Sequence, residues 1–519
     1  MHILMVAAEN DALPGGKVGG LGDVIRDVPA ALARAGHQVS VLTPGYGIFA
    51  ATEMASQVDT VTTSFCGRDE PLALFSVRAP VEVPGVRHWV LEHPLFSAGG
   101  KGRIYTSEGE GPFADDAHRF ALFCAAAAET IANGCLGRPD VLHCHDWHTG
   151  LLLVLRRFAA GHRALQAIPA VFSIHNLSMQ GTRPLWETRS SLYGWFPDLQ
   201  ADYTLIADPR YRDCVNPLRA GINLADRVHT VSPTYAREIL GPSHWDQGVV
   251  GGEGLEADLQ RVHAEGRLFG ILNGCDYATP PATAAKPKAL WPRIEAALDQ
   301  WVAKQGARDS HYQALKHLHA WQRRRTAARP LLVSIGRLTA QKLFLLVQPR
   351  AEGSVMDEFL LRLGESVDGA FILLGSGDPE YDRFFTACQQ RHGNFLYLSG
   401  YSDELANTLY SSGDLFVMPS IYEPCGISQM LAMRAGVPCL VHGVGGLHDT
   451  VRHGIDGFSF TGADLPAKLE ALLGTLDQAL TLYRDDPGQW RAIATAAAAA
   501  RFSWDDSVAA YLRHLYTFA

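Results

Sequence analysis

The stretch from Asn10 to Asp27, "NDALPGGKVGGLGDVIRD", decides the fold, because it places a glycine-rich loop between an apolar run and a helical pattern. The run before it, "HILMVAA", has the composition of a buried strand, and "DVIRDVPAALARAG" has helical spacing. A second strand, "HQVSVLTP", follows and ends at Pro44. The order strand, helix, strand predicts a parallel sheet in an α/β domain.

The glycine loop is typical of an anion site. Backbone N–H groups at a helix N-terminus carry partial positive charge, glycine lets a ligand come close, and Lys17 adds a full charge. A dinucleotide cofactor is disfavoured, because the spacing is not GxGxxG and "VLT" stands where a ribose-binding acidic residue is expected. Glycines that serve only tight packing are the other interpretation.

The rest of the chain repeats the α/β pattern. "DVLHCH" and "AVFSIHN" are expected strands with polar C-terminal ends, where open α/β sheets bind ligands. A second series, from "RLFGILNG" near residue 267 through "PLLVSIGRL" to "VPCLVHG", predicts a second doubly wound sheet. We therefore expect a first domain at 1–250, a second at 251–500 with an elaboration at 278–330, and a C-terminal helix at 501–519 that packs back on the first domain.

Composition and charge narrow the class of protein. A chain of 519 residues is long enough for two domains, and no uncharged apolar run approaches the roughly 18 to 20 residues of a membrane span. The net charge of -9 disfavours nucleic acid as a partner. Nine scattered cysteines without a CxxC pair favour reduced thiols. The start, "MHILMVAAEN", indicates a strand rather than a signal peptide, so a cytoplasmic protein without a membrane partner is expected.

The second half contains three more features that suit a phosphorylated ligand. "GRLTAQK" places Arg337 and Lys342 just after a strand, where two cations can share one phosphate. "YEPCGISQ" places Glu423 after the strand "DLFVMPS", where a carboxylate can accept hydrogen bonds from sugar hydroxyls. "HGVGGLHDTV" puts Gly445 and Gly446 at a helix start, as in the first loop. Together these features predict a site for a phosphorylated sugar.

Ordered motifs along nearly the whole chain resemble those of the bacterial glycogen synthases and plant starch synthases. The motifs are "KVGGLGDV", "DVLHCHDWHTGL", "FSIHNLSMQG", "VSPTYAREI", "GILNGCD", "GRLTAQK", "LLGSGDP", "YEPCGISQ" and "GGLHDTV". The resemblance implies a retaining glucosyltransferase of the GT-B fold, with two Rossmann-like domains facing a central cleft and a terminal helix crossing back to the first. It also implies ADP-glucose as donor, the non-reducing end of an α-1,4-glucan or maltooligosaccharide as acceptor, and no cofactor or metal.

The resemblance assigns roles to individual residues. Lys17 would reach the donor diphosphate, Arg337 and Lys342 would hold the phosphates, and His175 and Glu423 would contact the glucosyl unit. Retention is explained in this family without an enzyme nucleophile, so Glu423 would bind and orient, and the leaving phosphate would accept the acceptor's proton. The other residues assigned to substrate binding are Gly19, Gly20, Asp23, Asp146, Asn176, Asn273, Tyr401, Cys425, Gly426, Gly445 and Gly446.

Several alternatives stay open at this point. The segment after Lys342, the segment after "NGCD" and residues 182–200 depart from the family pattern, which leaves room for UDP-glucose or another acceptor. A catalytically silent glucan-binding paralogue would lose a charge-handling residue, whereas Lys17, Arg337, Lys342 and Glu423 are all present. "HCHDWH" could suggest zinc, but strand alternation sends Cys144 to the face opposite the two histidines of "HCH".

Overall fold

The computed structural model of the chain describes residues 1–106, 113–285, 287–323 and 329–518. These residues form two compact units. The first comprises Met1–Ser243, Gly251–Gly274 and Trp504–Ala519, and the second comprises His244–Val250 and Cys275–Ser503. No helix among the described residues is long and apolar enough to cross a membrane.

A mixed sheet forms the centre of the first unit, and its described strands follow the order β11-β10-β7-β6-β1-β2-β5-β4-β3. Neighbouring strands pair in parallel from β11 to β5, whereas β5, β4 and β3 pair antiparallel. The strands of this sheet are β1 (His2–Val6), β2 (Gln38–Pro44), β3 (Ala55–Phe65), β4 (Arg68–Val77), β5 (Val86–Glu92), β6 (Val141–His145), β7 (Ala170–Ile174), β10 (Arg227–Thr230) and β11 (Leu268–Gly270); β8 (Arg183–Pro184) and β9 (Cys214–Val215) form a separate pair.

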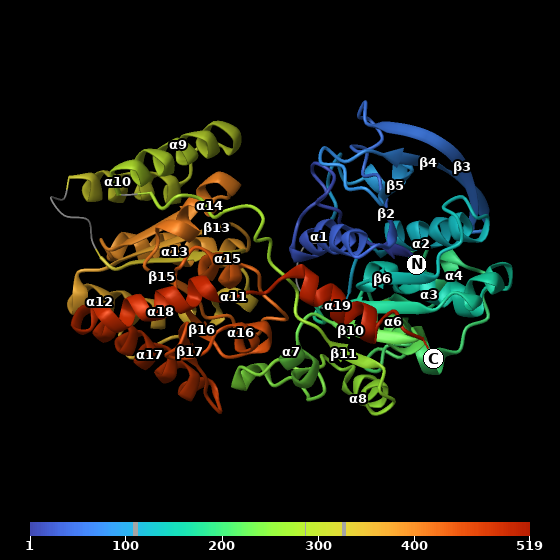
Figure 1. The fold of residues 1–519 in the computed structure, drawn as a ribbon. Coiled ribbons are helices and arrows are strands. Elements are labelled where there is room, and N and C mark those ends of the chain that lie inside the picture. Colours follow the sequence, from blue (N-terminus) through green and yellow to red (C-terminus); the bar gives the residue numbers. More distant parts are fainter. Residues whose placement is uncertain (107–112, 286, 324–328, 519) are drawn as a thin grey trace. The chain divides into compact units, whose positions relative to one another are not determined.

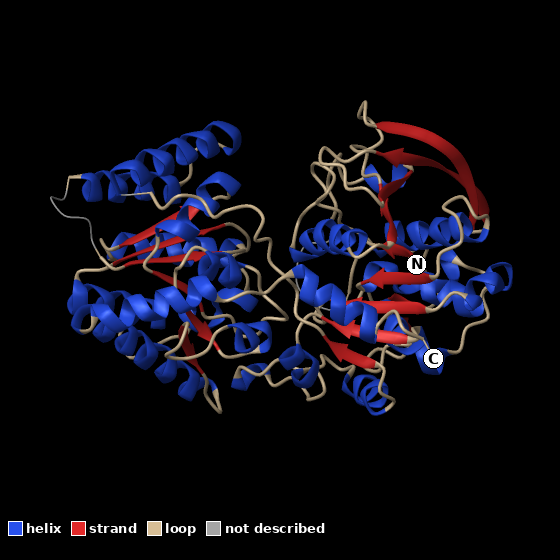
Figure 2. Ribbon diagram, in the orientation of Figure 1, coloured by secondary structure: helices blue, strands red, loops and turns tan. Residues whose placement is uncertain are grey.

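Helices cover both faces of this sheet, as Figure 2 shows. On one face α1 and α19 pack in a core with the inward side chains of β1 and β2, and α2 and α3 pack on the other. The helical segments of the first unit are α1 (Gly20–Arg34), η1 (Pro94–Ser97), α2 (Ala117–Ala132), α3 (Trp147–Phe158), η2 (Ala160–Ala167), α4 (Leu192–Trp195), α5 (Tyr203–Ile206), α6 (Pro217–Leu224), α7 (Pro233–Glu238), α8 (Glu256–Ala264) and α19 (Trp504–His514).

The second unit contains a parallel sheet whose described strands follow the order β14-β13-β12-β15-β16-β17. Its central strands are buried on both faces, which explains why they are continuous apolar runs in the sequence. The strands are β12 (Leu331–Ile335), β13 (Ala370–Gly375), β14 (Phe395–Ser399), β15 (Leu415–Met418), β16 (Cys439–His442) and β17 (Gly457–Phe460).

Two apolar cores lie on the two faces of this second sheet. Helices α9, α10 and α14 contribute to one core, and α12, α13 and α17 to the other (Figure 1). The helical segments of the second unit are η3 (Trp245–Gln247), α9 (Pro287–Gln305), α10 (Asp309–Gln322), α11 (Ala340–Val347), α12 (Val355–Val367), α13 (Pro379–Arg391), α14 (Asp403–Ser412), α15 (Ser428–Arg434), α16 (Gly445–Thr450), α17 (Leu465–Asp485) and α18 (Pro487–Ala499).

The units differ from the domains expected from the sequence in two places. The run near residue 267, taken as the start of the second sheet, is β11, and it pairs in parallel with β10 at the edge of the first sheet. That expectation was wrong, because a three-residue apolar run does not reveal which sheet it joins. His244–Val250 pack with the second unit, where the Lys468 ammonium donates to the Gly248 carbonyl at 2.9 Å.

The C-terminal helix packs in the first unit, as the sequence predicted. Trp504 Nε1 donates to Asp27 on α1 at 3.0 Å, and Ser507 Oγ donates to the Leu272 carbonyl at 2.7 Å. Gly274 accommodates this contact, since a Cβ there would lie 2.5 Å from the Trp504 nitrogen. The last helix therefore completes the core that α1 begins.

Candidate active site

Each sheet has a point where the strand order reverses, and most of the predicted site residues follow strands at or beside these points; Asn273 and Tyr401 follow the edge strands β11 and β14. In the first sheet β1 lies between β2 and β6, so the chain leaves β1 to one side and returns on the other. In the second sheet β12 lies between β13 and β15. In open α/β sheets the crevice at such a point, beyond the carboxyl ends of the strands, is where ligands bind.

In the first unit a buried glutamate, Glu9, holds the glycine loop. Its Oε2 accepts from the backbone nitrogens of Val18 and Gly19 at 2.8 Å each and of Gly22 at 3.2 Å, and its Oε1 accepts from the Tyr105 hydroxyl at 2.7 Å. The anion at the start of α1 is therefore a carboxylate of the protein itself. The sequence interpretation gave the Gly19 N–H to a ligand phosphate, and in the structure Glu9 already accepts from it.

Lys17, in the same loop, belongs to a network of charges at the first turn of α1. Its ammonium donates to Asp23 at 2.6 Å and lies 3.8 Å from Asp11. Arg26 also contacts both of these carboxylates. The Lys17 side chain keeps 40% of its surface exposed, so it stays accessible to a ligand while it is paired.

Asp146 follows β6 at the reversal point and has an unusual backbone. Its φ is +57°, a conformation that residues with a side chain rarely adopt and that occurs preferentially at functional sites. The carboxylate accepts from the His175 nitrogen at 2.7 Å, which ties the end of β6 to the end of β7. Burial raises the pKa of Asp146 to about 7, although the backbone N–H groups of His175 and Asn176 oppose the shift.

His175 lies in a buried row of histidines. Its Nε2 is 3.0 Å from Nδ1 of His145, and the ring of His145 stacks on that of His143 with centroids 4.2 Å apart. His143 in turn contacts the Ser173 hydroxyl and the Tyr516 hydroxyl, each at 2.7 Å. Burial lowers the pKa of His175 to about 3 and holds the pKa of His145 well below its ordinary value, so the row is neutral and cannot add charge to the site.

Two asparagines complete the predicted set in the first unit. Asn176 accepts from the backbone and hydroxyl of Ser178, which fixes the turn after His175. Asn273 follows β11 and is 5% exposed, and its side-chain oxygen has no hydrogen-bond partner among the described residues. A buried polar atom without a partner is costly, so Asn273 is suited to bind a polar ligand group.

In the second unit the reversal point between β12 and β15 brings Lys342 and Glu423 together. The Lys342 ammonium donates to Glu423 Oε2, which also accepts from the Ser420 hydroxyl at 3.1 Å. The two side chains are 19% and 6% exposed. Lys342 and Ser420 line a small hollow together with Arg337, Gly336 and the end of β12.

Arg337 differs from Lys342 in its contacts. It is exposed, and among the residues that the structure describes its guanidinium has no hydrogen-bonded or ionic contact. An unpaired guanidinium beside a paired ammonium gives the hollow one more positive than negative charge. A phosphate group suits such a site.

Two glycine turns lie beside Glu423. Gly446 donates its N–H to the Glu423 carbonyl at 3.0 Å, and a Cβ at Gly446 would lie 2.1 Å from the Cys425 carbonyl oxygen. Gly426 has a φ of +75°. Gly445 starts α16, a helix of six residues. The turns therefore fix the backbone around Glu423, and Cys425 is buried in them.

Tyr401 is the one predicted residue that lies away from this reversal point among the described residues of the second unit. It follows β14, the edge strand, which lies two strands from β12, or about 10 Å. Its ring is 55% exposed, and its hydroxyl donates to Asp403 at 3.0 Å. A role at the Lys342–Glu423 pair would require a ligand that extends across the sheet edge.

Neither of two possible metal sites has suitable chemistry. Within the described ranges Asp357, Cys388 and His392 lie close together. However, the Arg391 guanidinium donates to Asp357 Oδ1 at 2.7 Å, and burial raises the pKa of the Cys388 thiol to about 12. In the "HCHDWH" segment Cys144 packs in the core on the opposite face from His143, and burial raises its pKa to about 12 as well.

The geometry and the comparisons with known proteins agree on the class of protein. The chain has two open α/β sheets with polar residues at their reversal points, and the second reversal point carries cations beside a carboxylate. These features define a glycosyltransferase of the GT-B fold. Residues 2–261 match the family model "Starch synthase catalytic domain", and residues 329–478 match "Glycosyl transferases group 1". The chain belongs to the glycogen synthase and starch synthase family.

Individual relatives match over nearly their full length. The chain is 36% identical to the glycogen synthase of Anaeromyxobacter sp. (strain Fw109-5) and 35% identical to that of Streptococcus sanguinis (strain SK36), with 98% of each chain covered in both cases. The catalytic domain of starch synthase IV from Arabidopsis thaliana, bound to ADP and acarbose, superposes with a TM-score of 0.76 at 28% identity. That match covers 99% of this chain and 98% of the other. The fold, the class of enzyme and the family expected from the sequence are confirmed.

Sequence reasoning missed three polar residues that the structure puts at the two sites. Glu9 directly follows the first apolar run, and the sequence predicts for it only a place at the end of the strand. Tyr105 and Ser420 contact Glu9 and Glu423 through their hydroxyls. Only Glu9 had a usable signal, namely a carboxylate just before a glycine-rich helix start, where negative charge is favoured.

Proposed function

We propose that the protein transfers glucose from ADP-glucose to the non-reducing end of an α-1,4-glucan with retention of configuration. The observation that carries the proposal is the Lys342–Glu423 pair beside Arg337 at the reversal point of the second sheet, where Arg337 has no partner among the described residues. Two cations suit a diphosphate, and a carboxylate next to them suits the hydroxyls of the attached sugar. The starch synthase IV structure, bound to ADP, supports adenine as the base of the donor.

The charges account for the chemistry. The bond between the anomeric carbon and the diphosphate oxygen breaks, and the electron pair stays on the diphosphate. Arg337 and Lys342 stabilise this developing charge, so they contribute more to the transition state than to the ground state. The acceptor hydroxyl forms the new bond to the anomeric carbon on the same face, and its proton passes to the departing phosphate oxygen. The products are ADP and a glucan longer by one glucose.

Glu423 acts by position in this scheme. Its Oε2 is already bonded to Lys342 and Ser420, which fixes the carboxylate and leaves Oε1 to accept from a sugar hydroxyl. The glycine turns at Gly426 and Gly446 hold the backbone on either side. No covalent glucosyl–enzyme intermediate is part of the proposal.

The first unit supplies the remaining roles. A lysine ammonium has three donors, so Lys17 can keep its bond to Asp23 and still contact a phosphate oxygen. Because Glu9 accepts from the Gly19 N–H, the loop contributes mainly Lys17 and the exposed Gly20 to donor binding. His175 and Asp146 are assigned to the glucosyl unit and the acceptor end, and Asn273 to a polar group of the substrate.

We also place the enzyme in the cytoplasm. All nine cysteines lie in the described part of the chain, and each is a free thiol. Free thiols in this number are typical of a reducing compartment.

The experiment is release of nucleoside diphosphate by purified protein, with ADP-glucose or UDP-glucose and with or without maltooligosaccharide. We expect release only with an acceptor present, and a kcat/KM at least about tenfold higher for ADP-glucose, which corresponds to about 1.4 kcal/mol. Glu423→Gln serves as the inactive control. A preference for UDP-glucose would contradict the donor, and absence of transfer to any glucan would contradict the function.

A further inference from the structure

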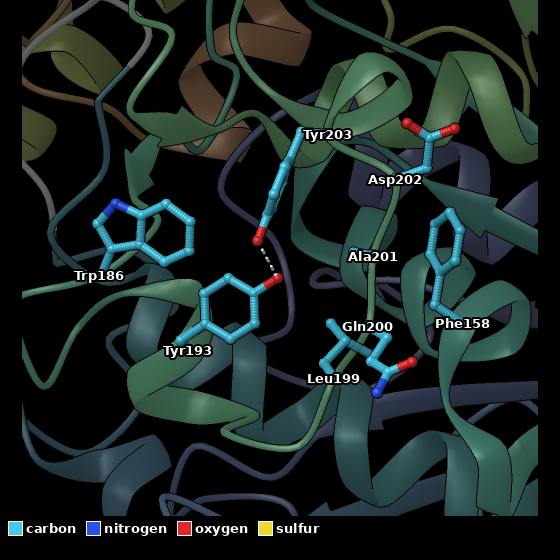
Figure 3. Close-up of a pocket in the computed structure, with 8 residues that line it drawn as sticks. All are labelled: Phe158, Trp186, Tyr193, Leu199, Gln200, Ala201, Asp202 and Tyr203. Carbon is cyan, nitrogen blue, oxygen red and sulfur yellow. Dashed lines mark hydrogen bonds between the residues drawn. The ribbon is translucent and has the colours of Figure 1, made fainter.

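A second hollow lies on the first unit, outside the residues assigned to the reaction. Its volume is about 590 Å³. It lies in a segment that departs from the family pattern, between β8 and α5, together with the end of α3. The residues that line it, called the aromatic hollow here, are Phe158, Trp186, Tyr193, Leu199, Gln200, Ala201, Asp202 and Tyr203 (Figure 3).

Three aromatic rings form one side of the aromatic hollow. Trp186 and Tyr193 stack with an interplanar angle of 13° and centroids 5.1 Å apart, and Tyr203 meets Trp186 edge-on at 5.6 Å. The Tyr193 and Tyr203 hydroxyls are 2.6 Å apart. Figure 3 shows these three side chains grouped together, with Phe158 and Asp202 across the hollow. Trp186 and Tyr203 are 44% and 39% exposed.

The backbone holds these rings in place without a ligand. The Tyr193 nitrogen donates to the Leu185 carbonyl at 2.9 Å, which sets Trp186 beside Tyr193. The Ser191 hydroxyl accepts from Gly194 at 3.1 Å and starts α4, whose Trp195 is fully buried. A side that is already ordered loses little conformational entropy on binding. Large exposed aromatic rings held in this way mark an interaction surface.

The polar groups of the aromatic hollow suit hydroxyls rather than phosphates. Gln200 and Asp202 are exposed at its rim, and Asp202 uses Oδ1 to cap α5 at Thr204, which leaves Oδ2 to accept from a ligand. None of the lining residues is a lysine or arginine. The Arg157 guanidinium lies outside this lining, 6.0 Å from the centroid of the Phe158 ring. A nucleic acid would place phosphates near the Asp202 carboxylate with no cation in the lining to neutralise them.

Sugar rings match both properties of this surface. Their C–H faces carry slight positive charge and stack on the negative faces of aromatic rings, and their hydroxyls bond to phenol, amide and carboxylate groups. Tyrosine and tryptophan present such faces with a polar handle. A helix or strand of a protein partner would bury the rings equally well but would leave the hydroxyl-matching rim unused.

The aromatic hollow is separate from the predicted reaction site. Phe158 is the last residue of α3, whereas Asp146 directly precedes its first residue. With twelve residues and about 1.5 Å per residue, α3 puts Phe158 about 16 Å from Trp147 along the helix axis. A ligand of several sugar units could occupy the hollow while its end lies elsewhere.

We propose that the aromatic hollow binds an inner segment of an α-glucan chain, apart from the chain end that reacts. This inference rests on the proposed function, since it is the polymeric acceptor that supplies the ligand. A second contact on the same polymer raises the local concentration of chain ends. The hollow therefore favours glycogen over short maltooligosaccharides as acceptor.

The test is binding without donor. Electrophoresis in native gels that contain glycogen measures Kd for the full chain, for Trp186→Ala, for Tyr203→Ala and for the control Tyr312→Ala. The control removes a more exposed ring, 68% exposed, on α10 of the second unit. We expect at least a tenfold weaker Kd for both hollow variants and no change for the control. Trp186→Phe keeps a ring and should recover most of the affinity.

Kinetics separate this inference from the proposed function. The ratio of kcat/KM with glycogen to kcat/KM with maltotriose should fall at least fivefold in Trp186→Ala and stay constant in Tyr312→Ala. Wild-type affinity for glycogen in both hollow variants, with normal unfolding curves, would overturn the inference while leaving transfer activity intact. If the two hollow variants lost binding to a proline-rich peptide and kept binding to glycogen, that result would overturn the inference too. Lack of transfer by the wild type would refute the proposed function, yet the gel assay would still report on the hollow.

Discussion

Replacement of Lys342 by methionine tests the central charge of the proposed site. Methionine keeps most of the side-chain length and removes the ammonium that donates to Glu423 Oε2. If Lys342 also stabilises the leaving diphosphate, its loss should cost about 3 kcal/mol in the transition state, which lowers kcat/KM by about two orders of magnitude. The assay is ADP release from ADP-glucose with maltooligosaccharide.

The same substitution also affects folding, and the structure sets the size of the effect. Removal of one partner from a fully buried ion pair costs about 3 to 5 kcal/mol, and from an exposed pair about 1 kcal/mol or less. The Glu423 side chain is 6% exposed and that of Lys342 is 19% exposed, so about 2 to 3 kcal/mol is expected for the stranded carboxylate. Urea unfolding of the second unit measures this cost.

A double variant distinguishes the two roles. Lys342→Met with Glu423→Gln leaves no unpaired charge, so the urea midpoint should recover, whereas activity should stay at or below that of the single variant. Arg362→Met is the matched control, because Arg362 pairs with Glu358 and Asp477 on α12 and α17 in the same unit. A phosphate role for Lys342 would be refuted if the activity of Lys342→Met were within a few-fold of wild type. Full recovery of activity in the double variant would also refute it.

Three further outcomes are expected. Arg337→Ala should lower kcat/KM about a hundredfold without shifting the urea midpoint, because Arg337 has no partner among the described residues to strand; a matching loss of stability would contradict this. Asp146 has a folded-state pKa raised to about 7, so the stability it contributes is full below about pH 4 and is lost as the pH rises through about 7. Asp146→Asn should therefore shrink the fall in urea midpoint between about pH 5 and about pH 8, and an unchanged fall would argue against the raised pKa. Gly446→Ala should lower the free energy of unfolding by about 1 to 3 kcal/mol, because its Cβ would lie 2.1 Å from the Cys425 carbonyl oxygen. Gly474→Ala has open space around it in α17 and should raise that free energy by up to about 1 kcal/mol. Equal unfolding midpoints in the two variants would contradict the crowding at Gly446.

The sequence predicts the parts of the fold that are buried on both faces. Strands such as β1 and β12 are short apolar runs followed by polar residues, and this pattern identifies both the strand and the end that carries the site. Strands β3 and β4 were not predicted, because Ala55–Phe65 is mostly exposed along its first half and has a weak apolar alternation. The partner sheet of β11 depends on contacts with β10, some 40 positions earlier in the chain, which no local pattern encodes.

The candidate site also has some features that the sequence predicts and others that it does not. Lys342 and Glu423 are 81 residues apart and meet only because β12 and β15 are neighbours in the sheet, yet each follows a predicted strand, so their approach could be anticipated. The internal partners of the glycine loop and of Lys17 could not be predicted. That Glu9 accepts from the glycine loop, and that Lys17 pairs with Asp23, depend on side-chain positions rather than on spacing.

The placement of α19 in the first unit has a consequence for biosynthesis. Trp504, Val508, Tyr511 and Tyr516 belong to the core shared with α1, and Tyr516 completes the row of histidines on β6. At about 5 to 20 residues per second, a ribosome needs roughly 12 to 50 s to add everything after Gly274. During that time one apolar face of the nascent first unit lacks its cover, so this face is a natural substrate for a chaperone until α19 leaves the ribosomal tunnel.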